Sequence, residues 1–137
     1  MSEVALAEFS DVRTFVSRVV SDLVAGSTLT HSAADLQVLQ ALVAHEAMKH
    51  ANYEAWVAVG IAFGDCLAAY IPGLAWCLAT DQNGTNAALR YRNKTLAIFA
   101  PTMLWKRVER GEEVDLLHIA GELKGFMEQH AHEYRDA

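Results

Sequence analysis

The chain opens with apolar residues at three- and four-residue steps, which is the spacing of one face of an α-helix. The residues that recur in the first stretch are Ala5, Phe9, Val12, Val16, Val19 and Leu23. Gly26 and Ser27 are expected to end this helix. Ser32 to Asp35 resembles a capping box with Asp in place of Glu, and it predicts the start of a second helix. The apolar side of that helix consists of Leu36, Leu39, Leu42 and Val43.

A third helix is predicted from the N-cap residue Asn52 to about Tyr70, with Pro72 and Gly73 as its stop. Gly60 and Gly64 lie four residues apart inside it, on one face. Glycine within a helix costs about 1 kcal/mol relative to alanine. We therefore expect another element, plausibly a sheet, to pack closely on this face.

The pattern then changes to a period of two, which is typical of strands. Leu74, Trp76 and Leu78 alternate with smaller residues, and the segment 81–84 (Asp-Gln-Asn-Gly) is a strong turn sequence. Residues 87–91 predict a returning strand, the polar segment 92–94 a second turn, and residues 95–99 a third strand. Three strands with short turns indicate an antiparallel meander.

Two helices are predicted to close the chain. Pro101 suits the first turn of a helix that runs to about Arg110 and stops at Gly111. The apolar face of the last helix consists of Leu116, Ile119, Leu123, Phe126 and Met127. The segment after it is polar and is expected to be frayed.

These elements predict an α+β fold with N-terminal helices, a three-stranded antiparallel meander and two C-terminal helices packed on the sheet. We expect one domain over residues 1–137, made of an N-terminal helix (1–30), a main region (31–127) and a polar tail (128–137). An apolar content of 53% in 137 residues is enough for a core.

Composition narrows the classes of function. The net charge is −6, with 17 acidic and 11 basic residues, which disfavours a nucleic-acid partner. Glu3 and Glu8 stand where an export signal needs positive charge, and the apolar run 55–71 is too short and too interrupted to span a membrane. We therefore expect a cytoplasmic protein. Cys66 and Cys77 have no metal or redox spacing, so we interpret them as buried thiols.

Histidines give no metal motif. His45 and His50 are five residues apart, so on a helix their side chains diverge by roughly 140°, whereas a zinc helix needs a separation of four. His130 and His132 lie in the tail without an obvious third ligand. We expect no bound metal and no cofactor.

Other charged residues leave alternatives open. Asp65 and Asp81 either converge as paired carboxylates or act singly, as a helix-surface and a turn residue. The charge run 106–113 after Trp105, together with Arg90, Arg92 and Lys94, either forms a basic patch or pairs with the chain's own carboxylates.

Several short motifs in a fixed order resemble the bacterial family called domain of unknown function 3806. They are GIAFGD at 60–65, GLAW at 73–76, Asp81 with Gly84, ALR at 88–90 and the run from Pro101 to Glu112. The resemblance covers about residues 36–123 and implies an α+β fold. It implies no reaction and no cofactor, so no catalytic residue is carried over.

We therefore favour a non-enzymatic protein of the immunity type, which binds and neutralises a cognate toxin. Small size, acidity and the lack of a catalytic motif motivate this hypothesis. The acids expected to contact a basic partner are Glu112, Glu113, Glu122 and Glu128. One alternative is a small-ligand domain or enzyme, with a pocket formed by Asp65, Trp76, Asp81, Lys106 and Arg107. Another is a structural subunit of a larger assembly.

Overall fold

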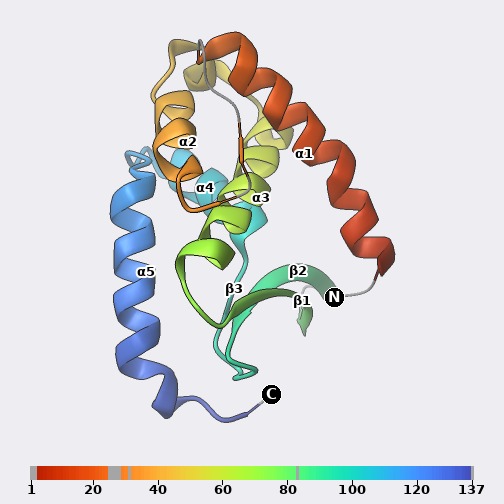
Figure 1. Cartoon of the computed structure of the whole chain (residues 1–137), viewed down its shortest axis with the longest axis vertical. Helices are drawn as coiled ribbons and strands as arrows, with labels where there is room; N and C mark the ends of the chain where they lie inside the picture. Colours follow the sequence, from red (N-terminus) through yellow and green to blue (C-terminus); the bar gives the residue numbers. More distant parts are fainter. Residues whose placement is uncertain (1–2, 25–28, 31, 83, 137) are drawn as a thin grey trace.

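One helix, α3 (Tyr53–Tyr70), lies at the centre of the structure, and the other elements pack around it (Figure 1). The structure is a computed structural model, and it describes residues 3–24, 29–30, 32–82 and 84–136. The other α-helices are α1 (Glu3–Leu23), α2 (Asp35–Val43), α4 (Ala100–Glu109) and α5 (Leu116–His130). The strands are β1 (Leu74–Asp81), β2 (Gly84–Tyr91) and β3 (Ala97–Ile98), and short 3₁₀ turns occupy η1 (Glu46–His50) and η2 (Ala131–Glu133). The predicted α+β class and order of elements are confirmed.

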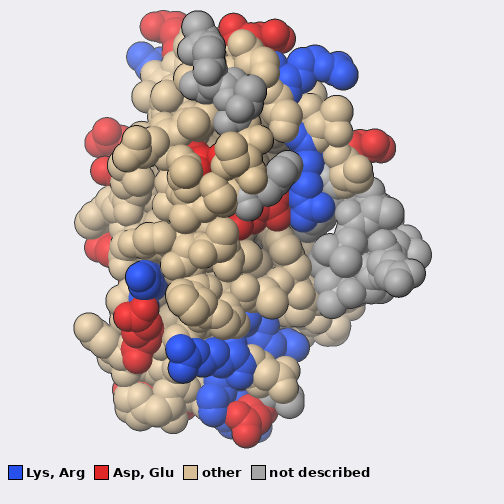
Figure 2. Space-filling view, in the orientation of Figure 1, with Lys and Arg blue, Asp and Glu red and all other residues tan. Residues whose placement is uncertain are grey.

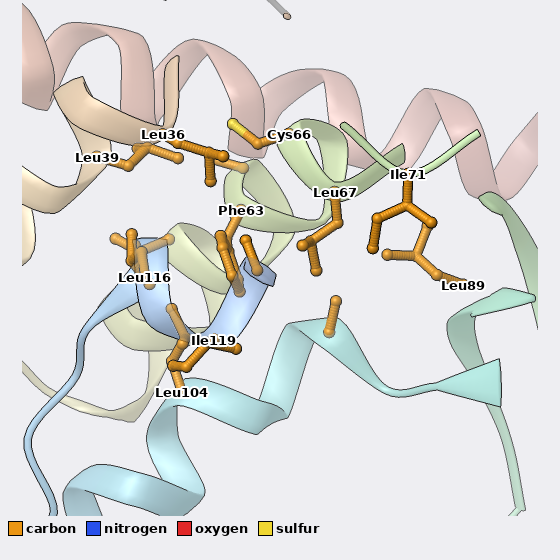
Figure 3. Close-up of a cluster of buried hydrophobic side chains, with 14 of the residues drawn as sticks. Leu36, Leu39, Phe63, Cys66, Leu67, Ile71, Leu89, Leu104, Leu116 and Ile119 are labelled. Carbon is orange, nitrogen blue, oxygen red and sulfur yellow. The ribbon is translucent and has the colours of Figure 1, made fainter. Parts of the chain in front are cut away.

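The central position of α3 follows from its composition. It begins where predicted, because the Asn52 side chain accepts a hydrogen bond of 2.9 Å from the Ala55 N–H. The helix is apolar on most of its circumference, and such a helix must be covered on several sides. Figure 3 shows Phe63 and Leu67 of α3 in the buried cluster, which also takes in Leu39 of α2 and Leu116 of α5. The predicted core of the helical face is thus shared by α2, α3 and α5.

Gly60 and Gly64 allow two neighbours to approach α3 closely, as expected. A Cβ atom on Gly60 would lie 2.7 Å from the backbone oxygens of Ala100 and Pro101. A Cβ on Gly64 would lie 2.5 Å from the ring of Trp76. The sheet is therefore the neighbour at Gly64. At Gly60 the expectation of a sheet contact is wrong, because the first turn of α4 occupies that position.

The sheet has the order β1-β2-β3 and is antiparallel throughout. Its first hairpin pairs Leu74 with Tyr91 and Asp81 with Gly84, so the predicted turn is a two-residue loop, and Gly84 has a φ of +108°. The second turn contains Arg92 and Asn93, both with positive φ, as tight hairpin turns require.

The third strand is shorter than predicted, because the C-terminal tail takes over the pairing of residues 94 and 95. The Thr95 N–H donates to the Arg135 carbonyl at 2.9 Å, and Lys94 forms a bridge with Asp136. The Lys94 ammonium also lies 2.8 Å from the Asp136 carboxylate. The expectation of a frayed tail is therefore wrong for the described residues.

The capping box predicted at Ser32 is also wrong. The N-cap of α2 is Ala34, and it makes no side-chain cap bond. The Asp35 carboxylate instead accepts hydrogen bonds from the Thr30 N–H at 2.8 Å and the Thr30 hydroxyl at 2.9 Å. Asp35 is 3% exposed, and a carboxylate so deeply buried needs such donors. The predicted stop of the first helix at Gly26 and Ser27 lies outside the described residues.

Helix α4 starts and stops as predicted. Pro101 is in its first turn, and Gly111 follows its C-cap with a φ of +71°. The Gly111 N–H donates to the Val108 carbonyl at 3.0 Å, and the Glu112 N–H donates to the Arg107 carbonyl at 2.9 Å. These two bonds form a Schellman motif, which satisfies the last carbonyls of the helix.

Helices α4 and α5 differ in what they cover. Helix α4 packs on α3 and β2, whereas α5 packs mainly on α2 and α3 and is followed by the tail that returns to the sheet. The prediction that both C-terminal helices pack on the sheet therefore holds for α4 and is wrong for α5, whose apolar face covers helices instead. Across the described ranges, no helix combines the length and the apolar character needed to cross a membrane.

We expect Gly60→Ala to lower the free energy of unfolding by about 1–3 kcal/mol, because the added methyl meets backbone that cannot rotate away. The matched control is Gly121→Ala on α5, where a Cβ meets nothing within 4 Å. That change should raise stability by about 0.5–1 kcal/mol through helix propensity. Urea denaturation midpoints measure both effects, and equal responses of the two variants would contradict the close approach at Gly60.

Candidate functional site

Asp65 on α3 accepts three side-chain hydrogen bonds from two other elements. Arg13 of α1 donates to it twice, from Nε to Oδ2 at 2.8 Å and from Nη2 to Oδ1 at 2.9 Å. Trp76 of β1 donates from Nε1 to Oδ1 at 3.0 Å. A bidentate arginine pair is directional as well as strong. Asp65 therefore joins three elements that are far apart in the sequence.

Burial strengthens this arrangement. The side chains of Arg13 and Asp65 are 26% and 16% exposed, so water screens their attraction only in part. The hydrogen bond to Asp65 raises the pKa of Arg13 above its ordinary value, against a smaller opposing effect of desolvation. Of the roughly four acceptor positions of the Asp65 carboxylate, the donors of Arg13 and Trp76 fill three, two on Oδ1 and one on Oδ2. Most of its hydrogen-bonding capacity thus serves to hold three elements together, and this geometry suits structural support.

The residues proposed from the sequence as one ligand pocket are distributed over several places. Asp65 and Trp76 are in contact, and a hollow of about 540 Å³ lies beside Asp65, bordered by Arg13, Ala68 and Ala69. Asp81 is five residues beyond Trp76 on β1, which corresponds to about 16 Å along the strand. A convergence of Asp65 and Asp81 as paired carboxylates does not fit this spacing.

Lys106 and Arg107 line two other hollows. Lys106 lies beside Glu109 and Arg110 in a shallow depression on α4. Arg107 faces α5 across a hollow of about 560 Å³, in which it is joined by Phe126 and Glu122 among others. The structure therefore does not place Asp65, Lys106 and Arg107 around a common cavity.

The four acids proposed as a partner-binding set are all exposed, but they differ in their contacts. Glu112 lies 2.7 Å from Nε of Arg110, and Glu122 lies 2.9 Å from Nε2 of His118. Glu113 and Glu128 have no hydrogen bond or ion pair to any described residue. Glu113 and Glu128 are thus the members whose charge is least compensated.

The Trp105 ring contacts the Tyr53 ring edge-on, with 5.6 Å between centroids. On the face drawn in Figure 2, one group of Lys and Arg side chains lies at the lower end, where Figure 1 places the C-terminus, and others lie at the upper end and right of the centre. Asp and Glu side chains are dispersed over the same face. Arg110 and Lys94 pair with carboxylates of the chain, in line with the ion-pairing alternative.

The histidines and cysteines have structural surroundings. Nδ1 of His45 accepts a hydrogen bond from the Ala47 N–H and so caps η1. Nδ1 of His130 lies 3.2 Å from the Glu133 carboxylate. Among the residues that the structure describes, no three His, Cys, Asp or Glu side chains are grouped in a way that fits a metal ion. Cys66 is buried, and Cys77 is half-buried.

Arg13 is the important residue that the sequence reading missed. It stands three positions before Val16 and seven before Val20, both fully buried, so it lies on the apolar face of α1. A cation on the buried face of a helix needs a partner. That position was the available signal, although it could not identify Asp65 as the partner.

A comparison with protein families shows the family of this chain. The model of the family described as "Domain of unknown function (DUF3806)" matches residues 35–119. The chain belongs to this family. The match includes Asp65 and Trp76 but not Arg13, so one partner of the Asp65 network lies outside the matched region.

The fold is also similar to a crystal structure, at 1.50 Å resolution, of a protein from Bacteroides thetaiotaomicron VPI-5482. The two chains are 16% identical with a TM-score of 0.75, and the similarity covers 90% of this chain. This chain spans 45% of the length of that protein. At this identity the similarity concerns the fold alone. None of the curated proteins matches the chain.

We expect Asp65→Asn to lower the free energy of unfolding by about 1.5–3 kcal/mol, because the charged hydrogen bonds are lost and the amide group opposes the Arg13 donors. A double-mutant cycle with Arg13→Gln should give a coupling energy of about 0.5–3 kcal/mol. Glu122→Gln, which breaks an exposed pair, is the control and should change little. Additive effects of the Asp65 and Arg13 variants would show that the pair contributes nothing.

The two thiols should differ in reactivity. Burial, together with the charges of Asp35 and Asp65, raises the pKa of Cys66 to about 12. At pH 8 the thiolate fraction of Cys66 is then on the order of 10⁻⁴, and thiolate is the reactive form. We expect Ellman's reagent to label Cys77 in the native protein and both cysteines in urea. Rapid native labelling of Cys66, identified by mass spectrometry of the Cys77→Ser variant, would contradict this assignment.

Proposed function

We propose that this chain is a non-catalytic binding protein of the cytoplasm that recognises a basic protein, and that the partner is a cognate toxin which it neutralises as an immunity protein. The observation that carries the proposal is the set of exposed carboxylates on α5 and the loop before it. Glu113, Glu122 and Glu128 project from this region on a chain whose net charge is −6.

Charge of this kind acts mainly on association. A negative surface attracts a positive partner before contact and raises the rate of productive encounter. The attraction weakens with salt, since the Debye length is about 8 Å at physiological ionic strength. The α5 region also exposes Leu117 and Phe126, at 48% and 43%. These side chains supply apolar area beside the charges.

The engagement of Asp65 supports binding over catalysis. Asp65, which the sequence favoured for a reactive pocket, borders a hollow but has three of its roughly four acceptor positions filled by Arg13 and Trp76. A general base must accept a proton from its substrate, and only one acceptor position of Asp65 is left for that.

The test begins with affinity capture from the native host and identification of the co-purifying protein. The association rate of the purified pair is then measured at increasing salt. Reversal of Glu113, Glu122 and Glu128 to Lys should lower the association rate by roughly tenfold or more at low salt, while the dissociation rate changes less. Glu112 is left in place because it pairs with Arg110 at the end of α4.

A matched control is a variant in which three neutral α5 residues, Gly121, Gly125 and Gln129, become Ala. It alters the same helix without altering charge. Unfolding midpoints of both variants verify that the fold is intact. A partner without positive charge, or an association rate that ignores both salt and the reversals, would contradict the proposal.

A further inference from the structure

A second surface feature lies where α1 crosses α3. A hollow of about 410 Å³ separates the two helices there. Its lining includes three buried or half-buried apolar residues, Val12, Ala55 and Ala58, together with the exposed Phe15 and the polar Asn52. Phe15 is 47% exposed, which is unusual for a large aromatic side chain on the packing side of a helix.

Two carboxylates border this hollow, Asp11 from α1 and Glu54 from α3. Both residues are exposed, and neither has a hydrogen bond or ion pair to any residue whose side chain the structure describes. Arg13 is the cation closest to them in sequence on α1, and Asp65 holds it by two hydrogen bonds. Arg13 is also two positions from Asp11, and side chains at this spacing do not face each other on a helix. The hollow therefore has two negative charges beside an apolar lining.

A hollow lined by an aromatic ring, two carboxylates and apolar side chains is complementary to an organic cation. The face of a phenyl ring attracts a guanidinium or ammonium group, and the carboxylates add charge-assisted hydrogen bonds. The aliphatic stem of the same side chain covers apolar surface. The N-terminus of α3 opposes a cation with about half a positive charge, but two full negative charges exceed it.

We propose that the hollow between α1 and α3 receives an arginine side chain of the basic protein partner. Arginine is favoured over lysine because its planar guanidinium stacks on a ring while its edge donates to carboxylates. The inference rests on the proposed function for the identity of the partner, and it names a contact other than the acidic region of α5.

The first experiment uses a capped Gly-Arg-Gly peptide as the probe and a capped Gly-citrulline-Gly peptide, which has the same shape without the charge. Amide chemical shifts of the ¹⁵N-labelled full chain are followed during titration. We expect saturable shifts confined to residues 11–15 and 52–58 with the arginine peptide, and none with the citrulline peptide. Shifts of equal size spread over all acidic surfaces would overturn the proposal.

Two double variants separate a local site from net charge, since each removes two negative charges. Asp11→Asn with Glu54→Gln should weaken peptide binding about five- to tenfold, whereas Asp22→Asn with Glu109→Gln, two exposed acids outside both proposed surfaces, should change it less than twofold. Phe15→Leu keeps the apolar surface and removes the ring, and it should weaken binding by about two- to fivefold. Equal effects of the two double variants would overturn the inference.

Binding measurements with the captured partner distinguish this inference from the proposed function. Loss of affinity in the Asp11/Glu54 variant, mainly through faster dissociation, supports the arginine contact. If the reversals on α5 slow association while the Asp11/Glu54 variant binds as tightly as the native chain, the proposed function stands and the hollow is not the arginine site. If neither salt nor the α5 reversals change the association rate of the complex, yet the peptide still binds at residues 11–15, the proposed function fails instead.

Discussion

The close approach of α4 to α3 at Gly60 is the constraint on which the rest of the structure depends. Two backbone carbonyl oxygens occupy the space that any other side chain at this position would need. Because α4 follows β3 directly, the position at which α4 packs on α3 also determines where the sheet ends. Trp76 of β1 fills the second glycine position, one turn along the same helix. The sheet and α4 are therefore fixed on one face of α3 by the absence of two side chains.

Asp65 connects this packed face to the rest of the molecule. It follows Gly64, so its carboxylate lies within reach of the same Trp76 ring that Gly64 accommodates. Arg13 completes the arrangement from α1, which also buries Val16 and Val20. Apolar contacts hold α1 against α3 without strong direction. The two hydrogen bonds from Arg13 to Asp65 fix the orientation of α1 on α3, and so they help to define the hollow where the two helices cross.

The two surfaces considered for binding differ in origin. The acids of α5 and its preceding loop are exposed along the length of this region, from Glu113 to Glu128, and they form an open surface. The hollow between α1 and α3 has one wall inside the region matched by the family, residues 35–119, and one wall outside it. Long-range attraction requires only the charge of the first surface, whereas recognition of a single side chain requires the shape of the second.

The sequence by itself determined the elements and their order, because these depend on interactions between near neighbours. Asn52 caps its own helix, and the positive φ of Gly84 and Gly111 suits turns at those positions. The alternation of larger and smaller side chains predicted the strand β1, which pairs with β2. The close packing at Gly60 and Gly64 was also predictable, since a buried helix tolerates such residues only for a reason. The neighbour at Gly60 was not, because spacing along a helix does not reveal which distant segment will fill the gap.

Only the tertiary structure decided which distant residues meet. The side chains of Arg13 and Asp65 are separated by 52 residues, and the Thr95 backbone N–H donates to the Arg135 carbonyl of a tail that was expected to be frayed from its composition. The predicted pocket residues were selected as polar groups near the ends of elements. The packing of α4 then placed Arg107 toward α5 and left Asp65 with α1 and β1. The residues at each turn determine where the chain reverses. Which charged side chains come together depends on how the helices cross in three dimensions, and the linear pattern of residues does not contain those crossing angles.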